Sequence, residues 1–143
     1  LKKGEKHLPI KVKDANGGIW KLEYDQQGNV IKRTNPLGAN STMVYADGLL
    51  KTITNAFGNS TSLLYDAQYN IKEIQDSLGN ISKYKYDIFG NTIKITNPKG
   101  AIQTKVFDLA NRITEITNFD GNNIHLKYDT SSKYLRLSCY WSK

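Results

Sequence analysis

The stretch GNISKYKYDIFGNTIKITNPKG, from Gly79 to Gly100, decides the fold, because its pattern recurs six times along the chain. Aromatic residues recur at gaps of 21, 20, 21, 21 and 21 residues: Tyr24, Tyr45, Tyr65, Tyr86, Phe107 and Tyr128. Glycines keep the same period: Gly17, Gly38, Gly58, Gly79, Gly100 and Gly121. A short unit repeated in tandem builds an array in which each unit packs on its neighbours. The pattern therefore predicts a scaffold and argues against a single catalytic centre.

The run before each aromatic anchor alternates apolar and polar residues. Two positions before the anchor stand Leu22, Met43, Leu63, Tyr84 and Leu126. Alternation with a period of two and one apolar face is typical of a half-buried strand. The unit ending at Phe107 is the weakest, because Lys105 takes the apolar place.

A second run in each unit has apolar residues three apart, as in Leu50 and Ile53 or Ile113 and Ile116. This spacing resembles one face of a helix. The segments are too short for a helix, rich in β-branched residues and bounded by Gly and Asn. We expect strands in which the first apolar residue packs down from the turn, or in which a bulge shifts the register.

Turn residues separate the two runs. The anchor is followed by Tyr-Asp-x-x-Gly, as at Tyr24–Gly28 and Tyr86–Gly90, where Asp accepts local backbone N–H groups and Gly supplies a positive φ. The second turn reads Asp/Asn-x-x-Gly in all six units, which favours a type I turn followed by a left-handed residue. Each repeat is then two antiparallel strands, and the fold class is an all-β meander of about a dozen strands.

The composition agrees with a sheet scaffold. The net charge is +7, but 17 of the 20 basic residues are Lys and three are Arg. Arg is the preferred residue for bidentate contacts to phosphates and bases, so we interpret the Lys excess as a solvated face and expect no nucleic-acid partner. The single cysteine, Cys139, excludes an internal disulfide and a Cys-based zinc site. We expect no membrane span or signal peptide, and we interpret a chain that begins with Leu1 as a piece of a longer polypeptide.

No common catalytic, zinc or phosphate-binding motif is present, so we expect no enzyme, no catalytic residue, no metal and no cofactor. The only histidines are His7 and His125, and we expect the latter on the surface. One Asp per repeat is too sparse for a calcium-binding solenoid. The aromatic ladder has two interpretations: a platform that stacks on sugars or bases, and a structural ladder inside the sheet, which we favour.

At these residues the chain resembles the Rhs/YD-repeat family. The family signature, Tyr-Asp followed by Gly and then Thr-Asp/Asn-Pro-x-Gly, stands at Tyr24–Gly28 with Thr34–Gly38, and again at Tyr86–Gly90 with Thr96–Gly100. The resemblance covers roughly residues 14 to 129. We predict that the signature residues are structural: Tyr24, Asp25, Gly28, Gly38, Tyr45, Gly58, Tyr65, Asp66, Gly79, Tyr86, Asp87, Gly90, Gly100, Phe107, Asp108, Gly121, Tyr128 and Asp129.

The resemblance implies a curved strip that is part of a spiralling β-shell. In bacterial Rhs polymorphic toxins and the C components of insecticidal toxin complexes, such a shell encloses a C-terminal toxin domain. We therefore expect a secreted or cell-surface scaffold whose partners are the rest of the shell and its cargo. Six repeats are far fewer than a closed shell uses, and the family's self-cleaving segment is not recognisable.

The flanks of the repeats are irregular. We expect an edge strand within residues 1–13, six repeats over 14–129, and a capping strand within 130–143, where Leu135, Leu137 and Cys139 alternate with polar or aromatic residues. Unpaired strand edges predict self-association, with a homodimer as the expected form. The alternative function is a cell-surface module that binds glycans or a neighbouring protein, with Trp20 or Trp141 stacking on sugar rings.

Overall fold

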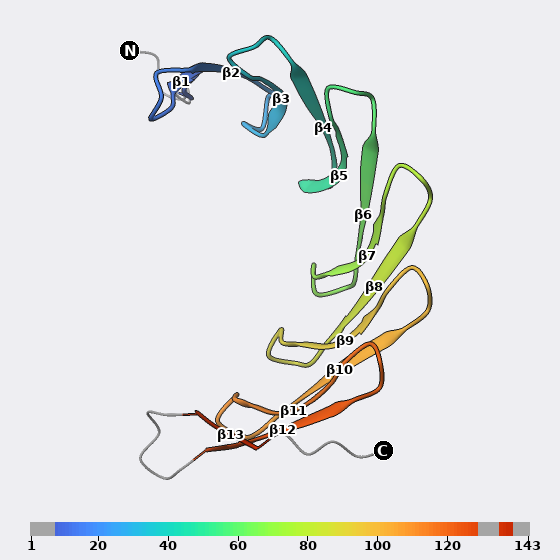
Figure 1. Ribbon diagram of the computed structural model, residues 1–143. Helices are drawn as coiled ribbons and strands as arrows, with labels where there is room; N and C mark the ends of the chain where they lie inside the picture. The colour runs from blue at the N-terminus through green and yellow to red at the C-terminus, as the bar shows by residue number, and fades with distance from the viewer. Residues whose placement is uncertain (1–7, 129–134, 139–143) are drawn as a thin grey trace. The chain divides into compact units, whose positions relative to one another are not determined.

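The computed structural model describes residues 8–128 and 135–138, and every regular element in these ranges is a β-strand (Figure 1). Strand order follows chain order without a crossover. The strands are β1 (Lys11–Lys13), β2 (Ile19–Tyr24), β3 (Val30–Thr34), β4 (Asn40–Ala46), β5 (Leu49–Thr54), β6 (Ser60–Tyr65), β7 (Ile71–Gln75), β8 (Ile81–Tyr86), β9 (Thr92–Thr96), β10 (Ile102–Phe107), β11 (Ile113–Thr117), β12 (Asn123–Tyr128) and β13 (Leu135–Ser138). The all-β antiparallel meander that the sequence predicted is confirmed, with two strands in each repeat.

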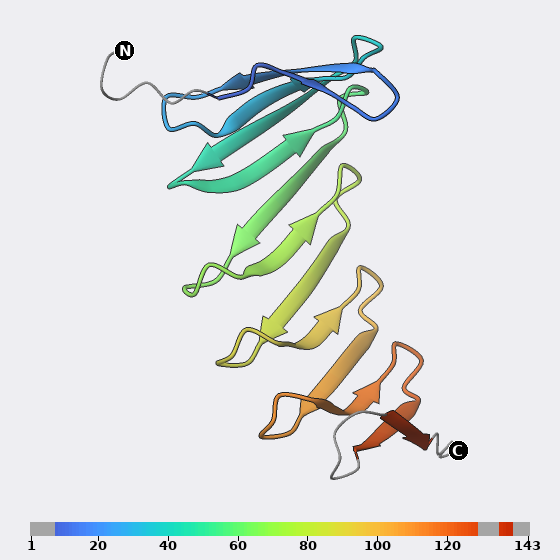
Figure 2. The same cartoon turned by 90° about the vertical axis from the view of Figure 1, so that its left-hand side faces the viewer.

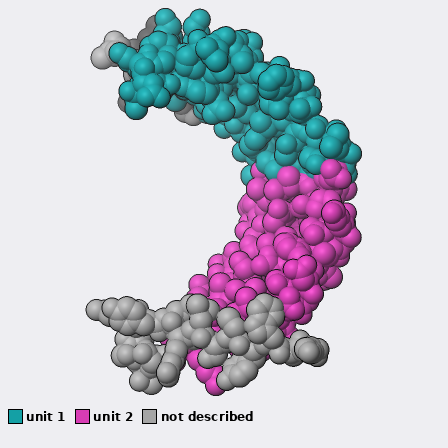
Figure 3. Space-filling view, in the orientation of Figure 1, with its two compact units in different colours: residues 1–63, 75–79 teal, residues 64–74, 80–143 magenta. Residues whose placement is uncertain are grey.

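The chain divides into two compact units, residues 1–63 with 75–79 and residues 64–74 with 80–143 (Figure 3). In the first unit each strand from β1 to β5 pairs antiparallel with the next strand along the chain. In the second unit the strands from β8 to β12 do the same. Within each unit tight turns join successive strands (Figure 2). The two units are thus built from the same hairpin.

A β-bulge precedes the aromatic anchor in four hairpins. In β4 and β5, Val44 lies opposite Thr52 but Tyr45 lies opposite Leu50, so β5 has one extra residue at this point. The same shift falls before Tyr24, Tyr86 and Phe107. An extra residue in one strand bends the strand and offsets the alternation of its side chains.

The bulge explains the apolar spacing of three in the second strand. Met43 and Tyr45 are two residues apart and share one face of β4, and they lie opposite Ile53 and Leu50. The extra residue brings both apolar residues of β5 onto the face of the anchor. The bulge expected from the sequence is therefore confirmed at this hairpin, and the helical interpretation is excluded.

Burial on the anchor face is partial. Among the described residues only Leu126 is buried, at 9% exposure, while the six aromatic anchors are all half-buried. A single layer of sheet covers an apolar side chain only with its neighbours on the same face. The half-buried strands that alternation predicted are confirmed. Because the anchors are only half-buried, truncating one should lower the free energy of unfolding by less than truncating a fully buried aromatic.

The repeat of Tyr45 has a different turn, because it is one residue shorter. Asp47 and Gly48 form a two-residue loop between Ala46 and Leu49, which lie opposite each other. Both loop residues have positive φ, 53° and 75°. Asp-Gly is a preferred pair for the type I′ turn, whose twist matches that of the flanking strands. The short repeat therefore keeps its hairpin by changing the turn type.

No helix in the described part of the chain is long and apolar enough to span a membrane.

Candidate functional site

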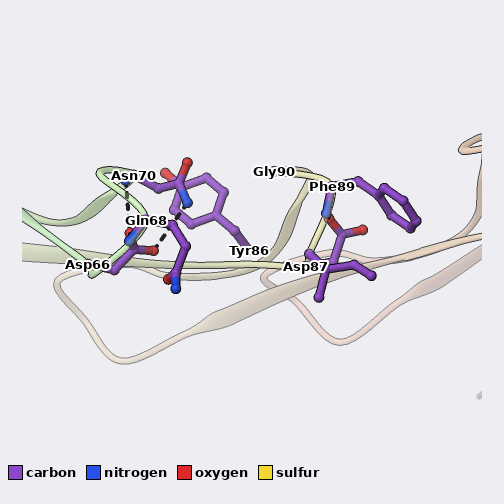
Figure 4. Close-up of a pocket in the computed structure, with 8 residues that line it drawn as sticks. Asp66, Gln68, Asn70, Tyr86, Asp87, Phe89 and Gly90 are labelled. Carbon is purple, nitrogen blue, oxygen red and sulfur yellow. Dashed lines mark hydrogen bonds between the residues drawn. The ribbon is translucent and has the colours of Figure 1, made fainter.

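A hollow of about 720 Å³ lies in the second unit between the turn after β6 and the turn after β8 (Figure 4). Polar groups come from both turns, and two large apolar side chains come from the second. Its lining is Asp66, Gln68, Asn70, Tyr86, Asp87, Ile88, Phe89 and Gly90. Two carboxylates and a phenol in one hollow raise the question of acid–base chemistry.

Both carboxylates are already held by their own turns. Asp87 Oδ1 accepts the backbone N–H groups of Phe89 and Asn91 at 2.9 Å each, and its Oδ2 accepts the Asn91 side-chain amide at 2.9 Å. Asp66 accepts the corresponding three groups from Gln68 and Asn70. Figure 4 shows the bonds between Asp66 and Asn70 within their own turn. The carboxylates order the backbone and are poorly placed to exchange protons with a ligand.

Hydrogen bonding keeps these acids ionised. The side-chain amide of Asn91 has the largest effect on Asp87 and lowers its pKa, against a smaller opposing effect of burial. For Asp66 burial is the largest effect and acts to raise the pKa, but the donors of Asn70 and Gln68 together outweigh it, so the pKa is lowered. A carboxylate that accepts several N–H groups favours its charged form. Neither group has the raised pKa expected of a general acid.

Tyr86 fastens its repeat to the one before it. Its hydroxyl donates to the backbone carbonyl of Ile71 at 2.8 Å, 15 residues earlier, and burial raises its pKa. The hydroxyls of other anchors make the same bond across the same separation: Tyr24 to Pro9, Tyr45 to Val30 and Tyr128 to Ile113, at 2.8, 3.1 and 2.7 Å. The anchor hydroxyl thus joins a repeat to the preceding one, and the aromatic ladder itself stays a prediction.

The ring of Trp20 is partly occupied. Arg33 lies over it at 5.0 Å from the ring centre, and its indole N–H donates to Asp14 Oδ2 at 3.1 Å. Arg112 lies over the Tyr128 ring in the same way, at 4.3 Å, and its guanidinium also pairs with Asp108 at 2.7 Å. Cation–π stacking of this kind covers one face of each ring. Trp141, the other proposed sugar-stacking residue, lies outside the described residues.

The described residues hold no group of three or more His, Cys, Asp or Glu side chains that could bind a metal ion. His125 is in β12, half exposed, with Nδ1 3.8 Å from Glu115 Oε2. His7, Asp129 and Cys139 lie outside the described residues, as does most of the expected C-terminal capping segment.

The signature residues take recurring places in the hairpins. The described signature tyrosines and Phe107 end the first strand of each repeat, except that Tyr45 is followed in β4 by Ala46, and the Asp residues open the first turn. The described signature glycines all have φ between 82° and 92°. Tyr69 and Asn111 replace Gly in two first turns and adopt the same left-handed conformation, with φ of 65° and 63°. The left-handed turn geometry is therefore kept in the two repeats where Gly is replaced.

One recurring residue was missed in the sequence: the one four positions after the turn Asp. Asn29, Asn70 and Asn91 donate their side-chain amides to the Oδ2 atom of that Asp, and Arg112 donates its guanidinium to Asp108. The signal was available, because Asn follows the turn Gly or its replacement in three repeats. The first turn is better described as Asp-x-x-Gly-Asn.

Comparison with known proteins places this hairpin in a wider group. The model of the RHS Repeat family matches residues 5–39 and 45–81, which are 72 of the 143 residues. No curated protein sequence matches the chain.

Several solved structures share the fold. They include TcdB2-TccC3 with TM-score 0.69 and 16% identity, TcdB2-TccC3-TEV with 0.71 and 15%, and the Photorhabdus luminescens Tc holotoxin pore with 0.69 and 15%. The likeness covers 87%, 91% and 87% of this chain but 8% of each of those chains. At such identity the likeness shows the fold alone.

Proposed function

The chain belongs to the RHS repeat family, and from this premise we propose that it is a non-enzymatic wall segment of a larger shell. The observation that carries the proposal is the repeated link between hairpins. The hydroxyls of Tyr45, Tyr86 and Tyr128 reach the carbonyl 15 residues earlier, so in both units repeats are fastened to their predecessors by a bond that needs no ligand. The carboxylates of the candidate hollow accept backbone N–H groups and so stabilise their own turns.

The cargo is a second part of this proposal. The resemblance to Rhs polymorphic toxins implies a shell that wraps, insulates and helps deliver a C-terminal toxin domain. The chain spans about 8% of the length of the solved chains it resembles. The rest of the wall and the toxin would therefore belong to the parent polypeptide, which would act outside the cell that makes it, secreted or at the cell surface.

Boundaries and self-association complete the proposal. Residues 14–129 would be wall repeats, and the flanks 1–13 and 130–143 would supply strands at either end, where β1 and β13 lie. An open strip has unpaired N–H and C=O groups at its terminal strands. The isolated chain would cover one of these edges, or its half-buried anchor face, by forming a homodimer.

Limited proteolysis of the parent protein tests the wall function. A closed wall should protect a C-terminal module from a broad-specificity protease in native buffer, and the module should be digested once the wall is opened with urea. The same module expressed alone is the matched control and should be digested in native buffer. Equal digestion of the module in the native parent and alone would contradict the proposal.

A second candidate is a surface module that binds glycans, favoured by one observation. Phe89 is 77% exposed and lines the same hollow as Gln68 and Asn70, so an aromatic ring and two amide groups belong to one lining. Sugars bind where a ring stacks on their apolar face and amides meet their hydroxyls. A glycan array should then show a signal that Phe89→Ala removes and Phe57→Ala keeps. A blank array would eliminate this candidate.

A further inference from the structure

A second hollow in the second unit, of about 420 Å³, is lined by four lysines and two carboxylates together with Tyr84, Tyr86 and Thr96. Apart from Asp66, its lining residues belong to β7, β8 and β9. The lysines are Lys72, Lys83, Lys85 and Lys94, and the carboxylates are Glu73 and Asp66. The charged strand residues, including Lys85, lie on the face opposite to the anchor Tyr86, because adjacent residues of a strand point to opposite faces.

Two of these lysines oppose each other directly. Lys85 of β8 is the cross-strand partner of Lys94 of β9. Residues in that relation have Cβ atoms about 4.5–5.5 Å apart, and like charges placed there destabilise the sheet. No carboxylate of a described residue lies within ion-pair distance of either ammonium group.

The nearby carboxylates are committed elsewhere. Glu73 lies 3.5 Å from Lys83, and Asp66 accepts the backbone and side-chain N–H groups of Asn70. The hollow therefore holds two ammonium groups, those of Lys85 and Lys94, that the described side chains do not neutralise.

The equivalent position in the first unit shows that the backbone does not require this arrangement. Glu23 is also the residue before an anchor and a bulge, and it lies opposite Lys32, with 2.7 Å between Nζ and Oε1. The other equivalent pairs are Val44 with Thr52 and Val106 with Glu115. Of these four bulged hairpins, only the one from Lys85 to Lys94 opposes like charges at this position. Like charges also lie opposite each other in two pairs outside them, Lys127 with Arg136 and Lys11 with Lys21. A local arrangement that weakens the fold without a local gain is expected at functional sites.

We propose that Lys85 and Lys94, flanked by Lys72 and Lys83, bind the carboxylates of an acidic polypeptide segment lying across β8 and β9. Charge complementarity supports this occupant. The lining contains no Arg, the residue suited to bidentate phosphate contacts. Tyr84 and Tyr86 also line the hollow, but both side chains are half-buried in the sheet. The site does not depend on the wall function and stands apart from it.

The test uses the whole chain and a fluorescently labelled deca-glutamate peptide. Fluorescence anisotropy at low salt should show binding that weakens as salt is raised, because the contacts are exposed ion pairs. Lys85→Glu should lower the affinity at least about tenfold, a change of about 1.4 kcal/mol. The same substitution recreates the pairing of Glu23 with Lys32, so the urea midpoint should not fall.

Two further variants make the result specific. Lys99→Glu makes the same charge change in a turn outside the hollow and should alter the affinity less than about twofold, since distant exposed charges are screened. Lys94→Thr places at this site the residue type that stands at Thr52, and should weaken peptide binding without loss of stability.

Three outcomes would overturn the proposal. One is no binding by the unmodified chain. Another is equal weakening by Lys85→Glu and Lys99→Glu, which would mean that only net charge matters. The third is tighter binding of a labelled oligo-dT, also dependent on Lys85, which would assign the site to nucleic acid instead.

Discussion

The repeat that ends on Tyr86 and the repeat that ends on Phe107 differ at the anchor by one hydroxyl group. Both rings close the first strand of a hairpin, follow a bulge and are half-buried. The Tyr86 hydroxyl reaches the carbonyl of Ile71, whereas Phe107 has no group that could reach the carbonyl of Thr92 at the same separation. An aromatic ring is therefore common to both anchor positions, and the hydrogen bond of the hydroxyl is present only where the anchor is Tyr.

The largest effect should come from removing the ring itself. Tyr86→Ala and Phe107→Ala should each lower the free energy of unfolding by about 2–3 kcal/mol, below the 3–5 kcal/mol of a fully buried aromatic. Urea denaturation followed by circular dichroism measures both. Phe57→Ala, at a turn residue that is 90% exposed, is the control and should change stability by less than about 0.5 kcal/mol. Equal effects at all three positions would refute the ladder.

Acid should weaken the first turns more than the second turns. Turn aspartates with lowered pKa, such as Asp87 and Asp108, stabilise the fold fully above the unfolded pKa of about 3.9. That stability is lost as the pH falls through the folded pKa. Most second turns use Asn, as at Asn97, which accepts the same backbone groups without titrating.

The combined change of Asp66, Asp87 and Asp108 to Asn should therefore flatten the decline of the urea midpoint between about pH 5 and pH 2. We expect some loss of stability at pH 7, because Asn offers one carboxamide oxygen where Asp offers two. Asp120→Asn is the control, since its side chain accepts no hydrogen bond from a described residue, and should leave the slope unchanged. An unaltered slope in the triple variant would contradict this role of the turn aspartates.

The hydroxyl should have a smaller effect than the ring. Tyr86→Phe should cost about 1 kcal/mol, the usual net contribution of a hydrogen bond. Phe107→Tyr should gain up to the same amount by reaching the carbonyl of Thr92. Thermal and urea unfolding should therefore show a loss of stability for Tyr86→Phe and a gain of stability for Phe107→Tyr. A loss of stability in Phe107→Tyr would show that this hairpin cannot place the hydroxyl.

The smallest effect should come from the left-handed turn residues. Tyr69→Gly removes the steric cost of φ 65° and should stabilise the chain by up to about 1 kcal/mol, reduced by the greater freedom of Gly in the unfolded chain. Asn111→Gly should be closer to neutral, because Asn tolerates this conformation. Differential scanning calorimetry separates the two. A larger gain for Asn111→Gly would reverse the expected order.

The sequence predicted the hairpins because their determinants are local. Alternation identified the first strands, Asp/Asn and Gly indicated the turns, and the spacing of Leu50 and Ile53 left a bulge as one of two explanations. One turn signal was missed: the Asp47-Gly48 pair of the shorter repeat is typical of a type I′ turn.

What the sequence did not reveal depends on the register between hairpins. The link from Tyr86 to Ile71 joins two hairpins, and no pattern within one repeat specifies which carbonyl a hydroxyl reaches. The opposition of Lys85 and Lys94 likewise depends on pairing across a hairpin that contains a bulge, where a one-residue shift would place other side chains opposite. The composition shows the excess of Lys, but it does not show which lysines lie opposite each other in the sheet.

The most direct test of the central claim is a cryo-EM structure of the parent polypeptide. The account predicts that residues 14–129 form continuous antiparallel hairpins within a closed β wall, with each anchor hydroxyl on the carbonyl 15 residues earlier and the wall enclosing a separate C-terminal module. Repeats lying open to solvent, with no enclosed module, would contradict it.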